Sequence, residues 1–323
     1  MKTWVIAILS FGLLMDECQA QTVVQGQADL TRFDFSANEP LELSGTWEFY
    51  WNTLLSPKDF ELNQNPEWVN VPGSWHRQGK YPRLGFGTYR TRLQLSGKES
   101  GLSLYFPIVN SSSRIWLNGE LAVETGVVGT DKNSYTAKLS GSVLSVPEKI
   151  KELEIIVQAA NYTYYNSGIG NTPQLGQSSS IFLMTNKLNG IENFFAGSLI
   201  AMFVYQFILY FLHHRGKPHL WLALICLGVA LRSLIVHGGS FLLPNLFPSV
   251  GFEIWKKIEF GSVYAVITLF PLYVYHLFTE AAPKRPLIFF IAVSGILCGF
   301  RVKVAQVMKR ERDLDYHFAV TIC

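Results

Sequence analysis

Apolar and polar residues alternate with a period of two along much of residues 41–185. From Tyr89 to Leu95 the odd positions can line a core, while Arg90, Arg92 and Gln94 face water. Residues 151–159 repeat the pattern. Such alternation is typical of a β-strand with one buried face. Further short strands are predicted at residues 41–50, 102–108, 142–146 and 180–185.

Turn residues separate these strands. Asn118-Gly119, inside residues 114–123, is a strong hairpin signal because both residues tolerate the positive φ of a type I′ turn. Gly, Pro and Ser separate the other segments, and no helical periodicity interrupts them. The fold class predicted for residues 21–185 is therefore an all-β sandwich or jelly roll.

Beyond residue 185 the pattern changes to long apolar runs. Residues 193–212 are twenty uncharged residues, and such a helix is about 30 Å long, the thickness of a hydrocarbon core. Residues 220–236 and 260–278 are two further candidate spans, the second with a kink expected at Pro271. Residues 286–300 are apolar over only fifteen positions, a partial span. An α-helical transmembrane bundle is predicted for residues 186–300, followed by an atypical charged tail at residues 301–323.

The first twenty residues have the parts of a secretory signal peptide. Lys2 precedes an apolar stretch at residues 5–15 that is too short to span a bilayer, and Cys18 and Ala20 are small residues suited to cleavage after Ala20. Residues 21–190 contain no cysteine, so the exported domain must be held together by its apolar core.

The composition agrees with a membrane segment. Charged residues are 16% of the chain, against about 25% in typical soluble domains. Residues 186–300 hold 12 of them, against 31 in residues 1–185. The net charge of +3 gives little attraction for nucleic acid. These figures argue against a cytosolic enzyme, a disordered chain and a nucleic-acid-binding protein, and they indicate the lipid bilayer as a partner.

The export signal sets the predicted orientation. With residues 21–190 outside, the loop with Arg215 and Lys217 is cytoplasmic, and so are Lys284 and Arg285, in agreement with the positive-inside rule. The loop between the second and third helices, at residues 237–259, is equally basic. Charge alone therefore does not decide the topology.

Four segments of the predicted β domain carry a family resemblance. In order and spacing they resemble the galactose-binding-like jelly roll that opens family 2 glycoside hydrolases: LSGTWEFYW at 43–51, VPGSW at 71–75, GFGTYRTRL at 85–93 and RIWLNGEL at 114–121. Those enzymes take their catalytic carboxylates from a following (β/α)8 barrel, and no barrel sequence follows here. Because Glu39, Glu42, Glu48 and Asp59 are scattered, we interpret them as solvated surface. No catalytic residue or cofactor is predicted, and we expect the protein not to be an enzyme.

A second resemblance covers about residues 25–300. NYTYYNSGIGNTPQLG at 161–176 resembles the end of the extracellular jelly roll in bacterial seven-transmembrane receptors with diverse intracellular signalling modules. The apolar segments at 194–215, 221–244 and 258–278 are similar to the first three helices of that family. The resemblance implies a multi-pass protein of the bacterial inner membrane with a periplasmic or extracellular N-terminal domain.

Full-length relatives in that family have seven helices and a cytoplasmic effector, and this sequence contains neither in full. Residues 301–323 match nothing expected at that place. We therefore interpret the chain as a truncated or frame-shifted product.

Two sets of candidate site residues emerge. Trp47, Trp75, Trp116 and Tyr89 could stack on a sugar, but large aromatic residues more often pack in a core. The segment that begins with Trp75 lies between a Val-Pro step and a Gly-containing loop, where exposure is favoured. The predicted ligand mouth consists of Trp75, His76, Tyr164, Tyr165 and Asn166.

Arg232 and His276 are the polar groups nearest the membrane interior, so they are candidates for coupling, with snorkelling to the headgroups as the alternative. His213, His214 and His219 lie in a basic membrane-flanking segment without carboxylate or thiol partners. No metal site is predicted there.

The predicted function is a sensory membrane receptor, truncated, whose exported jelly roll binds a small molecule, possibly in the carbohydrate class, and couples to transmembrane helices. One alternative is a membrane-anchored carbohydrate-binding protein or glycoside hydrolase accessory domain. Another is a non-functional gene fragment.

Overall fold

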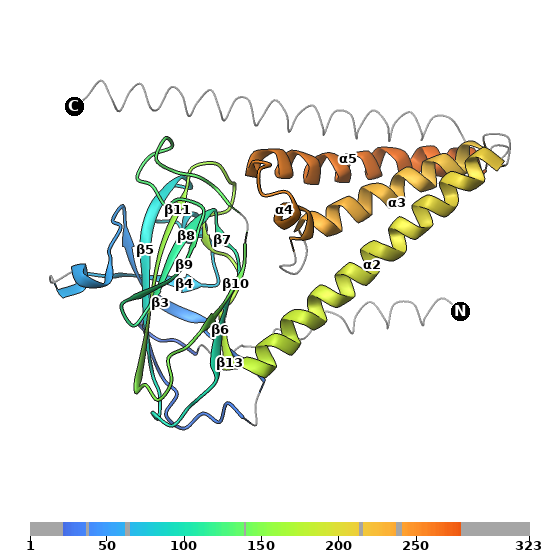
Figure 1. Ribbon diagram of the computed structural model, residues 1–323. Helices are drawn as coiled ribbons and strands as arrows, with labels where there is room; N and C mark the ends of the chain where they lie inside the picture. Colours follow the sequence, from blue (N-terminus) through green and yellow to red (C-terminus); the bar gives the residue numbers. More distant parts are fainter. Residues whose placement is uncertain are drawn as a thin grey trace, which may run out of the picture. The chain divides into compact units, whose positions relative to one another are not determined.

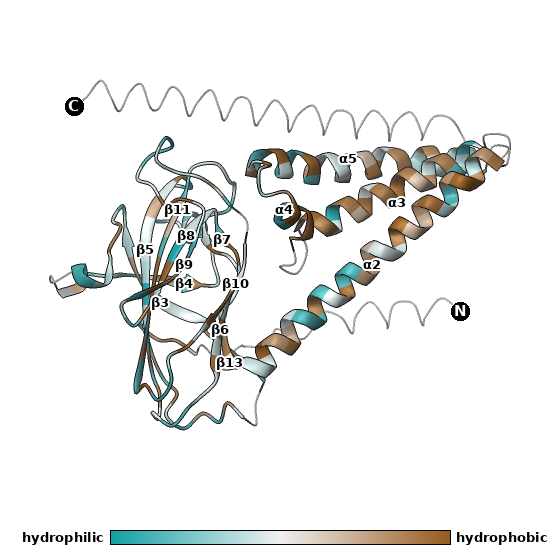
Figure 2. Ribbon diagram, viewed as in Figure 1, coloured by the Kyte–Doolittle hydropathy of each residue, from teal (hydrophilic) through white to brown (hydrophobic). Residues whose placement is uncertain are grey.

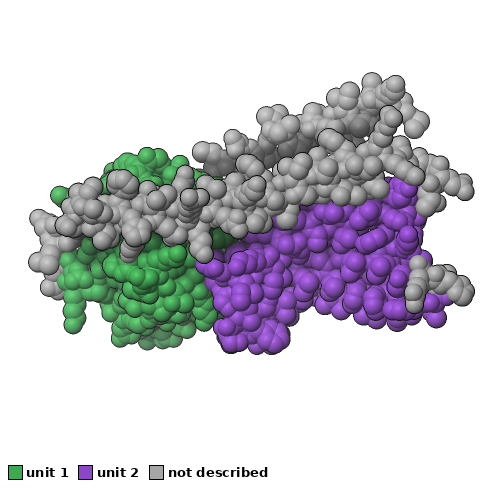
Figure 3. All heavy atoms as spheres, turned by 90° about the horizontal axis from the view of Figure 1, so that it is seen from above, with its two compact units in different colours: residues 1–182 green, residues 183–323 purple. Residues whose placement is uncertain are grey.

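The computed structural model describes residues 22–36, 39–61, 65–138, 140–212, 216–236 and 241–278. The chain divides into two compact units, residues 1–182 and residues 183–323, coloured separately in Figure 3. The proposed signal peptide, the partial span at 286–300 and the charged tail lie outside the described residues.

The first unit is a β-sandwich (Figure 1). Its larger sheet has the order β4-β3-β5-β11-β8-β9, and β1 pairs with β5 in parallel. The smaller sheet has the order β10-β6-β13-β2, and β12 pairs with β7. The strands of the larger sheet are β1 (Gln27–Asp29), β3 (Gly45–Trp51), β4 (Glu67–Val71), β5 (Gly85–Gln94), β8 (Ser112–Leu117), β9 (Glu120–Thr125) and β11 (Glu152–Asn161). The others are β2 (Leu41–Glu42), β6 (Leu102–Phe106), β7 (Val109–Asn110), β10 (Ser142–Ser145), β12 (Gly168–Ile169) and β13 (Gln174–Gln177), and two 3-10 helices, η1 (Pro57–Glu61) and η2 (Trp75–Gln78), lie between strands.

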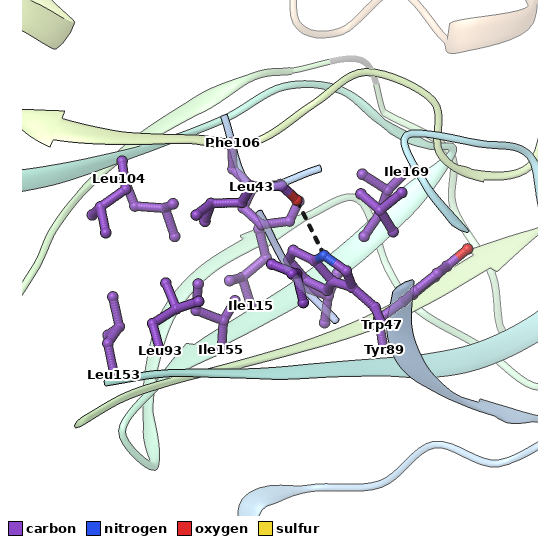
Figure 4. Close-up of a cluster of buried hydrophobic side chains, with 14 of the residues drawn as sticks. Leu43, Trp47, Tyr89, Leu93, Leu104, Phe106, Ile115, Leu153, Ile155 and Ile169 are labelled. Carbon is purple, nitrogen blue, oxygen red and sulfur yellow. Dashed lines mark hydrogen bonds between the residues drawn. The ribbon is translucent and has the colours of Figure 1, made fainter. Parts of the chain in front are cut away.

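The core lies between the two sheets. Figure 4 shows Leu93 and Ile155 of the larger sheet facing Leu104 of the smaller one, and all three side chains are fully buried. The Trp47 ring lies among them, and its Nε1–H donates to the Leu43 carbonyl at 3.2 Å. The period-two pattern thus supplies the apolar layer that joins the sheets.

The strand pattern predicted from the sequence is confirmed at its strongest points. In β5 the odd positions Tyr89, Thr91 and Leu93 are fully buried, while Arg90 lies on the opposite face. Asn118 and Gly119 have φ values of 47° and 88° and connect β8 to β9, as a type I′ turn requires. The fold class, a sandwich followed by membrane helices, is the predicted one.

Residues 180–185 are helical, so the strand predicted there is wrong. Helix α2 (Ser178–Leu212) begins at the residue after β13 ends. The prediction failed because a short continuous apolar run, here residues 181–184, has no periodicity that separates a strand from a buried helical turn. Helix therefore follows β13 directly, without a connecting loop.

The second unit contains α3 (Lys217–Val236), α4 (Leu242–Leu246), α5 (Phe252–Leu277) and most of α2. Among the described residues, α2, α3 and α5 are long and apolar enough to cross a membrane. Figure 2 shows hydrophobic residues around α3 and α5, and polar ones concentrated in the first half of α2. Apart from Phe278, the helices contain the predicted spans, but they begin earlier, α2 by fifteen residues and α5 by eight.

Helices α3 and α5 pack closely at Gly228. A Cβ atom at this position would lie 2.9 Å from Val266 Cγ2, closer than such atoms approach. By contrast, a Cβ atom at Gly261 on α5 would meet nothing within 4 Å. Small residues at helix interfaces allow this kind of close approach in membranes.

Replacing Gly228 by Leu is expected to force α3 and α5 apart and to lower the thermal unfolding midpoint of the purified full-length chain in detergent by several degrees. The matched variant Gly261→Leu is expected to leave the midpoint unchanged or raise it, because Leu favours a helix over Gly by about 1 kcal/mol. Equal midpoints for the two variants would contradict the close contact.

Glu48, expected at the solvated surface, is instead almost fully buried. Its Oε1 accepts from Arg92 Nη2 at 2.8 Å, and its Oε2 accepts from the Tyr50 hydroxyl at 2.9 Å. Burial and the bond to Glu48 raise the pKa of Tyr50 to about 12, so Tyr50 remains a donor. Arg90 joins the cluster, since its Nη1 lies 3.7 Å from Glu48 and its Nε donates to Glu154 at 2.7 Å. The sequence does not show this because the two arginines come from β5, more than forty residues further along the chain.

Replacing Glu48 by Ala is expected to destabilise the protein by about 2–3 kcal/mol, because the buried Tyr50 hydroxyl and the half-buried Arg92 lose their charged acceptor. Chemical denaturation followed by tryptophan fluorescence measures the change. The control is Glu124→Ala, which removes an ion pair with Arg114 of similar length, 2.8 Å, whose side chains are about one-third exposed, and should cost at most about 1 kcal/mol. A similar cost for both variants would show that the Glu48 cluster is not important for stability.

Candidate functional site

The structure brings the predicted mouth residues together from two distant segments, 74–83 and 161–168. The Ser167 N–H donates to Ser74 Oγ at 3.3 Å, and His76 Nδ1 lies 3.0 Å from Ser167 Oγ. Arg77 Nη2 donates to Asn166 Oδ1 at 3.0 Å. The two segments are about ninety residues apart in sequence, so these bonds define a junction that tertiary structure alone creates. We call it the loop junction.

Asn161 fixes the shape of the second segment. It is the last residue of β11 and is fully buried. Its Nδ2 donates to the carbonyls of Tyr164 and Asn166 at 2.9 and 3.0 Å, and its Oδ1 accepts from the Tyr164 N–H at 2.9 Å. Ser111 Oγ also donates to this oxygen at 3.0 Å. The sequence pattern does not single out Asn161, although an Asn at the end of a strand is a known turn signal.

Gly168 allows the second segment to lie against the core. Its φ is +73°, a conformation that favours glycine, and a Cβ atom there would collide with the Tyr89 hydroxyl and contact the Trp75 ring. The segment therefore rests directly on two buried aromatic residues.

Trp75 does not belong to an exposed mouth. It is 0% exposed, its Nε1–H donates to the Pro82 carbonyl at 2.9 Å, and its ring stacks on Phe49 with centroids 6.0 Å apart. Trp47 and Tyr89 are equally buried. The core interpretation is correct for these three residues, and the inclusion of Trp75 among the ligand-facing residues is wrong, because the apolar ring is drawn into the sandwich.

The exposed aromatic surface of the loop junction comes from two tyrosines. Tyr165 is 47% exposed, and its ring centroid lies 4.6 Å from that of the half-buried Tyr164. His76 and Asn166 are half-buried beside them. These four predicted residues thus share one surface, which offers an aromatic face, an amide and an imidazole.

The local charge at the loop junction is positive. Partial burial, with Arg77 and Arg83 nearby, lowers the pKa of His76 below its usual 6.5, so its imidazole is neutral at pH 7. Lys80 is paired with Glu67 at 3.3 Å. Residues 74–83 and 161–168 contain no Asp or Glu.

Arg232 and His276 lie toward opposite ends of the α3–α5 pair. Arg232 is exposed and lines a cavity of about 500 Å³ among α2, α3 and α5, with Glu192, Ser233 and Ser262 as other polar lining residues. The His276 ring contacts Trp221, near the start of α3, and its Nδ1 bonds to the Leu272 carbonyl at 2.8 Å. A coupling role for either residue stays a prediction.

Two polar pairs in the helices were not expected. His219, interpreted as part of a loop, lies on α3, and its Nδ1 is 2.8 Å from Gln206 Oε1 on α2. Lys256 and Glu259 form a buried ion pair of 2.6 Å on α5. No group of three or more potential metal-ligating His, Cys, Asp or Glu residues occurs within the residues described by the structure.

A β-sandwich joined to apolar membrane helices defines a multi-pass membrane protein with a folded domain outside the bilayer core. Residues 188–313 match the family described as 7TM diverse intracellular signalling. The match confirms the receptor resemblance stated from the sequence for the membrane part of the chain. The membrane part of the chain is therefore similar to the signalling module of that family, which supports a membrane receptor.

Glycosidases are among the solved structures that are similar to the chain. A β-glucuronidase from Ruminococcus gnavus in complex with D-glucuronic acid has 12% identity and a TM-score of 0.33, with 42% of this chain and 29% of that chain covered. A family 2 β-galacturonidase from Eisenbergiella tayi bound to galacturonate has 15% identity and a TM-score of 0.31, with 46% and 26% covered. The chain thus spans less than a third of these enzymes. No curated protein matches it.

Replacing Asn161 by Ala is expected to destabilise the protein by about 2–4 kcal/mol, because several buried groups lose their hydrogen-bond partners. Proteolysis within residues 162–167 should also become faster, since the loop loses its internal support. The control Asn133→Ala changes an exposed residue whose backbone N–H makes the bond to Asp131. Comparable unfolding free energies for the two variants would refute the role of Asn161.

Proposed function

We propose that the protein is a sensory receptor of the bacterial inner membrane whose periplasmic or extracellular β-sandwich binds a small molecule at the loop junction. The ligand contacts Tyr165, Asn166 and His76, with Tyr164 supporting the Tyr165 ring. Aromatic faces beside amide and imidazole groups suit the mixed apolar and hydroxylated surface of a carbohydrate. Binding changes the state of the membrane helices, which act on a cytoplasmic effector in longer relatives.

The observation that carries this proposal is the uninterrupted passage from β13 into α2. The first turn of α2 is bonded to the sandwich: the Ser178 N–H donates to the Gly101 carbonyl at 2.8 Å, and Ser178 Oγ lies 2.8 Å from Ser103 Oγ. From there α2 continues as helix to Leu212. A helix transmits displacement and rotation along its axis, whereas a flexible linker absorbs them.

Ligand binding is tested with the full-length chain in detergent by thermal shift against a library of small molecules that includes sugars. A ligand that binds only the folded state raises the unfolding midpoint in proportion to its affinity. Tyr165→Ala is expected to weaken binding by about tenfold or more, because a stacking contact is worth on the order of 1 kcal/mol or more.

The matched control is Leu121→Ala on β9, which removes another exposed apolar side chain, 54% exposed, and should leave affinity unchanged. If both variants lose the same amount of affinity, the binding site is not at Tyr165. Turnover of glycoside substrates by the same preparation would instead favour the glycosidase-accessory alternative.

A further inference from the structure

The loop junction concentrates basic groups without acidic neighbours of its own. Residues 74–83 and 161–168 supply His76, Arg77, Lys80 and Arg83 and no carboxylate. Of the nearby acidic residues, Glu67 pairs with Lys80, and Asp131 accepts the backbone N–H groups of Asn133 and Ser134 at 2.7 and 2.9 Å. These carboxylates are therefore held by other partners.

Arg77 and Arg83 keep hydrogen-bonding capacity for a ligand. Arg77 is exposed, and its Nη2 donates to the neutral amide oxygen of Asn166. Arg83 is half-buried, and its Nε is buried without a hydrogen-bond partner among the described residues. Because Arg83 is only half-buried, part of its side chain reaches the surface, where a carboxylate can offset the positive charge of its guanidinium.

Arg77 and Arg83 both lie at the loop junction. Arg77 Nη2 donates to Asn166 Oδ1 at 3.0 Å, and the Arg83 carbonyl accepts from Asn161 Nδ2 at 3.4 Å. Both positive charges also lower the pKa of His76. That imidazole is held by Ser167 next to Asn166 and the tyrosine pair. The cationic groups and the exposed aromatic face therefore belong to one surface.

We propose that the ligand of the loop junction carries a carboxylate, and that an acidic sugar is the class that fits it. The carboxylate binds Arg77 and Arg83, whose planar donors match its two oxygens. The sugar ring packs on Tyr165, and its hydroxyls bond to Asn166 and His76. This inference deepens the proposed function and depends on it.

The test compares matched sugars that differ only in the carboxylate: D-galacturonate with D-galactose, and D-glucuronate with D-glucose. Binding to the full-length chain in detergent is measured by calorimetry. At least one acid is expected to bind about tenfold or more tightly than its neutral partner, and added salt should narrow the difference. Arg77→Gln and Arg83→Gln should each reduce the affinity for the acid by about tenfold and leave neutral sugars unaffected.

Arg114→Gln is the matched control, because it removes one positive charge on β8, away from the loop junction, and should not change the affinity. The folded state of each variant is checked by its unfolding midpoint. A second readout is the pKa of His76, measured by NMR with His76→Gln for assignment. It should rise when the acid binds, since a nearby carboxylate favours the protonated imidazole.

The outcomes separate the two proposals. If acidic and neutral sugars bind with equal affinity and Tyr165→Ala weakens the binding of both, the ligand need not carry a carboxylate. The proposed binding site at the loop junction is then still supported. If Arg114→Gln weakens binding of the acidic sugar as much as Arg77→Gln does, the assigned contacts between the carboxylate and the arginines are wrong. Absence of binding by every sugar at millimolar concentration overturns the acidic-sugar class, while the receptor function is judged by the wider library.

Discussion

The ten-residue antiparallel pairing of β5 with β11 is the constraint on which the rest of the sandwich depends. It runs from Gly85 opposite Asn161 to Gln94 opposite Glu152. One face of the pair supplies core residues such as Leu93 and Ile155, and the other carries the Arg90–Glu154 bond that continues to Glu48. Because β11 ends at Asn161, the same pairing sets where the loop junction begins. The register of the β5–β11 pair therefore determines the positions of the core residues, of the charged cluster around Glu48 and of the candidate site.

Much of this fold could be predicted from the sequence, because its signals are local. Alternation in β5 and β11, Asn118-Gly119 and the long apolar runs each reflect a period or a turn that a few neighbouring residues determine. The features that escaped prediction depend on partners far along the chain. Glu48 reads as a surface carboxylate until Arg92 is placed beside it, and Trp75 reads as exposed until the sheets close over it.

In the candidate site, too, local features could be predicted from the sequence and contacts between distant residues could not. Its residue types could be chosen from the sequence, and four of the five predicted mouth residues share a surface. Their arrangement could not be predicted, because it depends on hydrogen bonds between segments about ninety residues apart, such as that of His76 with Ser167. The polar pairs of the helices follow this rule too: the local ion pair of Lys256 and Glu259 gains its importance from burial, which the sequence does not state.

The unbroken course of α2 has a consequence for how the chain can vary. Asn193, where the uncharged run starts, lies fifteen positions after Ser178, which is bonded to the Gly101 carbonyl. Each inserted or deleted residue in this stretch would turn everything beyond it by about 100° and move it by about 1.5 Å. The length of this segment therefore sets a helical phase, and relatives that keep the phase should differ here by about seven residues, or two turns, rather than by one or two.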